Sequence, residues 1–315
     1  MSQLNMRVYH DIEALPELNQ TVFTQGTFDG VHLGHVSLLN EVVKQAKRIG
    51  GESVLLTFWP HPKFMLFPED NELKLLQSLE EKLEAFEAIG IDHVLVLPFT
   101  QAFSAQLPLD YISGFLVNAL NMHTIIVGYD HRFGKNREGD IHLLKQYAST
   151  YSYEVIEVSA KDVDQIAVSS TKIRHALNAG QIELANDYLG RPYQLSGTVV
   201  SGKQLGRTLG FPTANIELPF KHKLIPAKGV YLVKVWVQGQ AHYGMMNIGD
   251  NPTIAEKSFS IEVNIFDFKA DLYGQTIRVD MLSWLRSEKK FKDINELAQN
   301  LKLDETHARE KINSL

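Results

Sequence analysis

The strongest chemical pattern in the chain is the run GTFDGVHLGH at positions 26–35, which places two histidines around a glycine. Residues 21–25 are short and β-prone, and the apolar residues after the run recur at helical spacing up to Gly50. The pattern predicts a strand, a loop and a helix N-terminus, where unpaired N–H groups favour an anion. His32 and His35 can both donate to phosphate oxygens, which points to a nucleoside triphosphate.

A metal site and a plain helix cap are the two alternatives for this run. Zinc binding needs a third ligand and usually a spacing of i, i+4, which the two histidines do not have. Helix capping alone would require neither two histidines nor three glycines. The run also lacks the Gly-Lys-Ser/Thr of a P-loop and the spaced glycines of a dinucleotide fold, so the histidines must supply the phosphate contacts.

The same ten residues resemble the HxGH signature of the nucleotidylyltransferase superfamily. In its full length the run closely resembles the amino-terminal module of the bacterial bifunctional riboflavin kinase/FAD synthetase family. The resemblance implies that His32 and His35 hold the phosphates of ATP, and that Gly26, Asp29 and Gly34 belong to the same nucleotide site.

Two further polar segments follow expected strands. TFWPHP at 57–62 holds His61 on a loop that two prolines stiffen, and GYDHRFG at 128–134 places Asp130 between glycines. Taken alone, the first is also typical of a rigid turn and the second of a polar surface turn. The family resemblance implies that His61 and Asp130 contribute to the substrate pockets. His131 stands where the family usually has phenylalanine, which would change stacking if this position lines the flavin site.

The segment SSTKIR at 169–174 opens an expected helix. Serine or threonine there is equally typical of a simple N-cap. In the superfamily an ISSTxIR segment closes over the ATP phosphates, which implies phosphate contacts for Ser170, Thr171 and Arg174, with Arg174 opposing the charge of the leaving pyrophosphate. Adenylyl transfer needs no base, because a phosphomonoester is already ionised at neutral pH and must only be aligned while the leaving charge is stabilised.

A second group of motifs begins with SGKQLGRTLGFPTANI at 201–216, a flexible basic loop that is a weak signal by itself. With PTAN included, it closely resembles the riboflavin kinase signature GRxLGFPTAN. The resemblance implies that Thr213 and Asn215 engage ATP and its Mg²⁺, which prefers hard oxygen ligands. The alternative is that the proline and asparagine only shape a turn. The other expected contacts in this loop are Gly202, Lys203, Gly206, Arg207 and Gly210.

Phosphorylating riboflavin requires a base, because the acceptor is a neutral alcohol. Glu262 alternates with apolar residues on an expected strand, which is also typical of an exposed strand carboxylate. In the family an EVHIFDF-like strand carries the catalytic glutamate, so the resemblance implies that role for Glu262. Asn264 stands where histidine is usual, and Asn247 lies in the matching segment MNIGDNPT that brackets the same site with DLYG at 271–274.

The periodicity predicts an α/β fold that positions these motifs, with an antiparallel barrel in its second part. Residues up to 190 alternate strands with helices and should form a mainly parallel sheet, in which Ser78 and Glu81 form the capping box of a helix that ends at Gly90. Closely spaced strands then indicate a small antiparallel β-barrel, followed by a terminal helix from Asp293. The expected strands are 21–25, 53–58, 92–97, 124–127 and 153–158, then 193–200, 229–237, 242–247, 259–268 and 276–285. We therefore predict an FMN adenylyltransferase (FAD synthetase) domain at 1–190 and a riboflavin kinase domain at 191–315.

Composition agrees with a cytoplasmic enzyme. The chain has 315 residues, 44% hydrophobic and 22% charged, and its formal charge of −6 argues against general nucleic-acid binding. The absence of cysteine excludes disulfides, thiolate catalysis and cysteine-bound metal. The amino terminus lacks the pattern of a signal peptide, and no apolar run reaches the ~20 residues that cross a bilayer.

The combined expectation is a bifunctional transferase that phosphorylates riboflavin to FMN with ATP and Mg²⁺, then adenylylates FMN with ATP to give FAD and pyrophosphate. We expect only small-molecule partners, ATP, riboflavin and FMN, with no nucleic acid and no membrane, and a monomer or weak homo-oligomer. Two alternatives remain. One is an enzyme that retains only one of the two activities, which the departures at His131 and Asn264 leave open. The other is a flavin-binding regulator without enzymatic activity.

Overall fold

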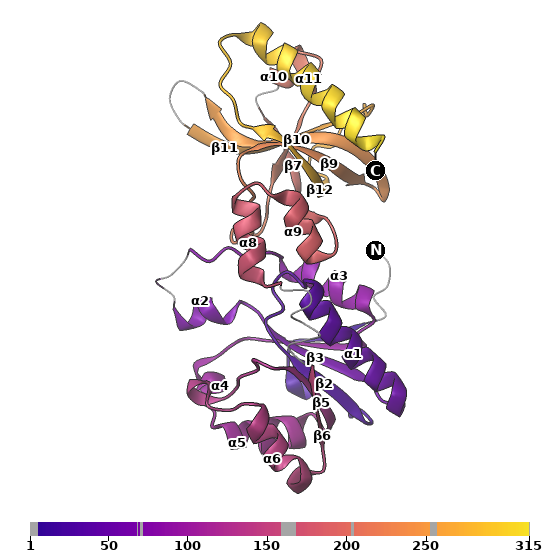
Figure 1. Ribbon diagram of the computed structural model, residues 1–315, viewed down its shortest axis with the longest axis vertical. Coiled ribbons are helices and arrows are strands. Elements are labelled where there is room, and N and C mark those ends of the chain that lie inside the picture. Colours follow the sequence, from indigo (N-terminus) through magenta and orange to yellow (C-terminus); the bar gives the residue numbers. More distant parts are fainter. Residues whose placement is uncertain are drawn as a thin grey trace. The chain divides into compact units, whose positions relative to one another are not determined.

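The computed structural model describes residues 6–67, 69, 72–158, 168–202, 205–252 and 257–314. The chain folds into two compact units, Met1–Ser169 and Ser170–Leu315 (Figure 1). The first contains a six-stranded sheet of order β1-β4-β3-β2-β5-β6 with parallel neighbours. The second contains a closed antiparallel barrel of order β10-β11-β8-β7-β12-β9. The predicted fold class is confirmed.

The bounds of the elements are as follows. The first unit has strands β1 (Arg7–Tyr9), β2 (Thr21–Gln25), β3 (Ser53–Phe58), β4 (His93–Leu97), β5 (Met122–Gly128) and β6 (Glu154–Val158). Its helices are α1 (Leu33–Ile49), α2 (Pro62–Leu66), α3 (Leu79–Ile89), α4 (Gln101–Ser104), α5 (Pro108–Asp110), α6 (Ile141–Tyr151), the 3₁₀ turns η1 (Ile12–Ala14) and η3 (Lys135–Arg137), and the π-helix η2 (Tyr111–Ala119). The second unit has α8 (Ser170–Asn178), α9 (Ile182–Leu189), β7 (Tyr193–Val200), α10 (Leu205–Thr208), β8 (Ala214–Glu217), β9 (Gly229–Val237), β10 (Gln240–Pro252), β11 (Lys257–Ile265), β12 (Thr276–Ser287) and α11 (Ile294–Ile312).

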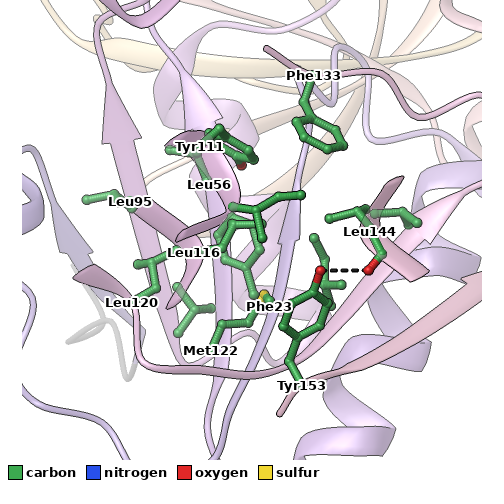
Figure 2. Close-up of a cluster of buried hydrophobic side chains, with 14 of the residues drawn as sticks. Phe23, Leu56, Leu95, Tyr111, Leu116, Leu120, Met122, Phe133, Leu144 and Tyr153 are labelled. Atoms are coloured by element: carbon green, nitrogen blue, oxygen red, sulfur yellow. Dashed lines mark hydrogen bonds between the residues drawn. The ribbon is translucent and has the colours of Figure 1, made fainter. Parts of the chain in front are cut away.

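The central strands of the first unit are buried on both faces. In β2 the side chain of Val22 packs with α1 and α3, whereas that of Phe23 packs with η2 and α6. Figure 2 shows the apolar cluster around Phe23, in which the Tyr153 hydroxyl donates to the Leu144 carbonyl at 2.6 Å. Because both faces are covered, these strands carry apolar side chains on both faces, as parallel strands between helical layers do.

Strand order places the predicted nucleotide motifs at one edge of this sheet. From β2 the chain moves outward to β3 and β4, then returns to the other side of β2 at β5. The point of reversal between β2 and β5 is where open parallel sheets bind ligands, beyond the carboxyl ends of the strands. The loop at 26–32 follows β2, and the loop at 129–134 follows β5. Both predicted loops therefore flank the reversal point.

Local signals in the sequence set the helix ends. Ser78 and Glu81 form both hydrogen bonds of the capping box of α3, at 3.3 and 3.1 Å, and Gly90 ends that helix with φ +93°. The predicted terminal helix is α11, and Asp293 is its N-cap. The predicted strand 259–268 ends earlier, at Ile265, because Asp267 turns the chain with φ +57°.

Helices α8 and α9 belong to the compact unit that contains the barrel. Asn186 of α9 donates to the carbonyl of Met281 at 2.8 Å and accepts from the N–H of Tyr193 at 2.7 Å, so α9 is bonded to β12 and β7. The sequence changes from helical to strand periodicity at residue 190, whereas the compact unit begins at Ser170, the first residue of α8. A functional boundary at 190/191 stays a prediction.

Candidate active sites

The histidine pair lies where β2 leads into α1. His32 is the N-cap of α1, and its Nδ1 accepts the backbone N–H of His35 at 3.3 Å. The two rings stack with centroids 3.7 Å apart and planes 15° from parallel. Capping and phosphate binding are compatible, because a neutral His32 that accepts at Nδ1 carries its proton on Nε2 and can donate from there.

The loop before this pair has a strained backbone. Gly30 has φ +90°, but Phe28 and Val31 also lie in the left-handed region at φ +45° and +38°. This region disfavours bulky side chains, and a β-branched valine most of all. Both side chains are buried, and the Phe28 ring meets His35 edge-on at 5.2 Å and Phe86 of α3 at 5.7 Å. Packing against α3 therefore holds the loop.

Asp29 helps to hold the same loop. Its carboxylate is 3% exposed and accepts the N–H of Leu76 through both oxygens, at 2.9 and 3.2 Å. Gly26 is held by its N–H, which donates to the Leu56 carbonyl of β3 at 3.0 Å. A nucleotide contact for Gly26, Asp29 and Gly34 stays a prediction.

His61, like His32, is the N-cap of a helix. It caps the short helix α2, and its Nδ1 accepts the N–H of Lys63 at 3.1 Å. Beside it, Trp59 lies 5.4 Å from the ammonium of Lys82, a buried residue of α3. The Lys82 ammonium also donates to the Thr27 carbonyl at 2.7 Å. Sequence analysis did not single out Lys82.

The loop after β5 is linked to β2 across the reversal point of the sheet. The Tyr111 hydroxyl donates to Oε1 of Gln25, and Nε2 of Gln25 lies 3.4 Å from Nε2 of His131. Since the Gln25 amide is the donor, His131 accepts at Nε2 and carries its proton on Nδ1. Burial lowers the pKa of His131 to about 4, although Asp130 beside it acts in the opposite direction. His131 is therefore neutral near pH 7 and adds no positive charge.

The remaining residues predicted for this activity lie on α8, in the second unit. Ser170 opens the helix, so the predicted helix start is confirmed. Thr171 is exposed, and Arg174 is half-buried. Phosphate contacts of all three stay predictions.

In the barrel, the structure brings four predicted residues together. Glu262 of β11 pairs with Asn215 of β8 on one side and with Asn247 of β10 on the other. Oε2 of Glu262 accepts the hydroxyl of Thr213 at 3.2 Å, and Oε1 accepts that of Ser260 at the same distance. A carboxylate, an amide and a hydroxyl from three strand regions thus meet at one place.

Two glycines of the 201–216 motif make close approaches that leave no room for a side chain. A Cβ at Gly202 would lie 2.0 Å from Nδ2 of Asn215, and one at Gly206 would lie 2.2 Å from the Phe211 carbonyl oxygen. Only glycine fits such approaches, which explains two of the glycines in the motif. Gly210 has φ +83°, and Arg207 is exposed. The predicted contact Lys203 lies outside the described residues.

Asn264 supports the PTAN segment. Its side chain is 7% exposed, and Nδ2 donates to the Pro212 carbonyl at 2.8 Å. This bond fixes the residue before Thr213, so the substitution of asparagine for the usual histidine keeps a donor at the position.

Asn264→Leu should destabilise the barrel by about 1 kcal/mol, because it removes the hydrogen bond that the buried Asn264 amide donates to the Pro212 carbonyl. It should also raise the KM for ATP of the expected kinase activity, since Thr213, the predicted ATP ligand, loses its support. Asn264→His is the matched control, because an imidazole can still donate. Thermal unfolding and kinase kinetics would measure both effects. If the leucine and histidine variants have the same melting temperature and the same KM for ATP, Asn264 does not support the PTAN segment through this hydrogen bond.

Comparisons with known proteins match the two parts of the chain to two enzyme families. The FAD synthetase family model matches residues 15–172, and the riboflavin kinase model matches residues 189–312. Bifunctional riboflavin kinase/FMN adenylyltransferases from Listeria monocytogenes, Escherichia coli and Bacillus subtilis are 40%, 37% and 35% identical. These matches cover 91%, 97% and 93% of this chain and 91%, 96% and 92% of the relatives.

A solved structure shares the whole fold. A crystal structure described as a macrolide-efflux protein from Streptococcus pneumoniae is 32% identical, with a TM-score of 0.86 over 96% of this chain and 98% of that one. Within the described residues, no helix combines the length and apolar character needed to cross a membrane. Matched by both family models and by relatives along nearly its full length, the chain belongs to the bifunctional riboflavin kinase/FMN adenylyltransferase family, with the FAD synthetase domain first and the riboflavin kinase domain second.

Proposed function

We propose that the two transferase activities of this chain use separate sets of residues. The histidine loop, residues 26–35, serves the adenylylation of FMN. The Glu262 cluster, which consists of Glu262, Thr213, Asn215 and Asn247, serves the phosphorylation of riboflavin. The observation that carries the proposal is the contact between Glu262 and Thr213 beside Asn215, because it joins the base predicted for the kinase to the predicted ATP ligands. Two motifs meet there, and the residues in contact are 49 positions apart in the sequence.

In the barrel, Glu262 is the base that removes the proton of the riboflavin hydroxyl as the phosphoryl group arrives. Thr213 and Asn215 offer a hydroxyl and an amide oxygen, a donor set that fits Mg²⁺. When bound with ATP, Mg²⁺ would offset the negative charge of the phosphates. The hydrogen bond from Thr213 orients the Glu262 carboxylate, so a single side chain links nucleotide binding to the base.

In the first unit, no base is required. The second pKa of a phosphomonoester is about 6, so FMN attacks as an ionised phosphate. His32, donating from Nε2, and the N-terminus of α1 stabilise the charge that develops on pyrophosphate. For Arg174, which lies on α8 in the second unit, we propose a charge-assisted phosphate contact.

A time course with riboflavin, ATP and Mg²⁺, resolved by chromatography, tests both assignments at once. We expect FMN to appear first and FAD to follow. Replacing Mg²⁺ by excess chelator should lower both rates by about 100-fold or more, since the metal supplies several kcal/mol of charge stabilisation in such transfers. Supplying FMN directly separates the activities: FMN formation without any FAD from either substrate would restrict the chain to kinase activity. Rates unchanged by the chelator would contradict the metal site.

A further inference from the structure

Lys82 is a buried cation of the first unit that the proposed mechanism does not use. It lies in the first turn of α3, and its side chain is 2% exposed. The ammonium donates to the Thr27 carbonyl at 2.7 Å and lies 5.4 Å from the centroid of the Trp59 ring. One side chain thus joins α3 to the histidine loop and to the loop that carries His61.

A positive charge at this position is unfavourable for folding. The N-terminus of a helix carries a partial positive charge, which repels a cation in the first turn. Burial removes the ammonium from water, and it lowers the pKa of Lys82 to about 8, although the Asp29 carboxylate acts in the opposite direction. A buried apolar side chain of similar size often serves stability as well or better. A lysine here is therefore explained by what its ammonium contacts, the Thr27 carbonyl and the Trp59 ring, and not by burial or by its place in the helix.

The contact with Thr27 places the lysine at the strained part of the histidine loop. The Thr27 carbonyl accepts from the Thr57 hydroxyl as well, at 3.4 Å. The next residue, Phe28, has φ +45°, and its ring contacts His35. Holding the Thr27 carbonyl therefore fixes the backbone from which Phe28 supports the stacked histidines.

Titratable groups lie on each of the segments that Lys82 joins. From the histidine loop, Asp29 acts on it, and the other titratable groups there are His32 and His35. The 57–62 loop presents the Trp59 ring and carries His61. On α3 itself, the neighbouring Glu81 accepts the Ser78 N–H.

We propose that Lys82 is a positioning residue for adenylyl transfer, whose protonated ammonium holds the histidine loop and the 57–62 loop in the arrangement that receives ATP. The inference rests on the assignment of FMN adenylylation to the histidine loop. The hydrogen bond to Thr27 is charge-assisted only while Lys82 is protonated. Adenylylation should therefore decline as the pH rises through about 8, and the kinase in the same chain should not share this decline.

The test compares Lys82→Met, Lys82→Arg and the control Lys44→Met, which removes an exposed lysine of α1. At pH 7.5, Lys82→Met should lower FMN adenylylation by about 10- to 100-fold, because a slightly misplaced site loses that much. The kinase rate and the melting temperature should not fall. The alkaline decline should be absent from Lys82→Met and should move to higher pH in Lys82→Arg. Lys44→Met should behave as the wild type does.

Folding gives a second, independent measurement. Because the unfolded chain binds this proton more tightly than the folded one, the charged lysine opposes folding below about pH 8, and the penalty fades as the pH rises further. The melting temperature of Lys82→Met relative to wild type should therefore be highest at or below pH 8 and should decrease above it.

Three results would overturn the proposal. One is a wild-type adenylylation profile with no alkaline decline, and another is a profile left unchanged by Lys82→Arg. The third is a parallel loss of adenylylation, kinase activity and melting temperature in Lys82→Met, which would indicate a purely structural residue. A His32 variant assayed in parallel separates this failure from that of the proposed function, since an active His32 variant would refute the site itself.

Discussion

Replacing His32 with asparagine is expected to lower FMN adenylylation by about 100- to 1,000-fold, the usual cost of removing one donor that stabilises developing charge. Asparagine is chosen because His32 also caps α1, and asparagine is among the best N-cap residues. The helix should therefore stay intact while the imidazole donor is lost. Steady-state rates with FMN and ATP would measure the effect.

Alanine at the same position gives the complementary information. His32→Ala removes both the donor and the cap, so it should lose the same activity and in addition about 1 kcal/mol of stability. His142→Ala, which removes an exposed histidine from α6, is the matched control and should change neither property. An asparagine variant that keeps full adenylylation would reduce His32 to a helix cap.

Local rules explain what the sequence predicted correctly. The capping box of Ser78 and Glu81 involves residues three apart, and strands β2 and β3 follow from apolar runs bounded by turns. Strands too short for periodicity were missed. These are β1, with three residues, and β8, which begins inside the PTAN motif.

Side chains that act across the fold could not be predicted. Lys82 donates to Thr27, 55 positions earlier, and Asn264 to Pro212, 52 positions earlier. The helical pattern predicts that Lys82 is an ordinary exposed residue of an amphipathic helix, because lysines usually face water. The signal that could have found it is its place in the first turn, where a positive charge opposes the helix dipole.

For the site residues of the barrel, the family resemblance supplied what local rules could not. The resemblance predicted Thr213, Asn215, Asn247 and Glu262 as members of one site, and the barrel brings them together. It did not indicate that Ser260 also donates to Glu262, although the two residues are two apart on an expected strand and so share a face.

Glu262→Gln is expected to lower riboflavin phosphorylation by about 100- to 10,000-fold, the range typical for loss of a general base. The barrel should remain folded, because the hydroxyls of Thr213 and Ser260 can each accept as well as donate and so can bond an amide. Glu217→Gln, which neutralises an exposed carboxylate at the end of β8, is the matched control and should leave the kinase rate unchanged. An unaltered kinase rate in Glu262→Gln would remove this residue from its role as base.

The decisive form of this experiment follows both products from both substrates. Glu262→Gln given riboflavin should form neither FMN nor FAD, yet given FMN it should form FAD at a rate within about twofold of wild type, as independent sites predict. The asparagine variant of His32 should instead accumulate FMN from riboflavin. If each variant lacks only one activity, a mixture of the two should make FAD from riboflavin, because FMN released by one can be used by the other. Failure of the mixture, with each variant still active in its own half-reaction, would mean that FMN does not leave the chain on which it is made.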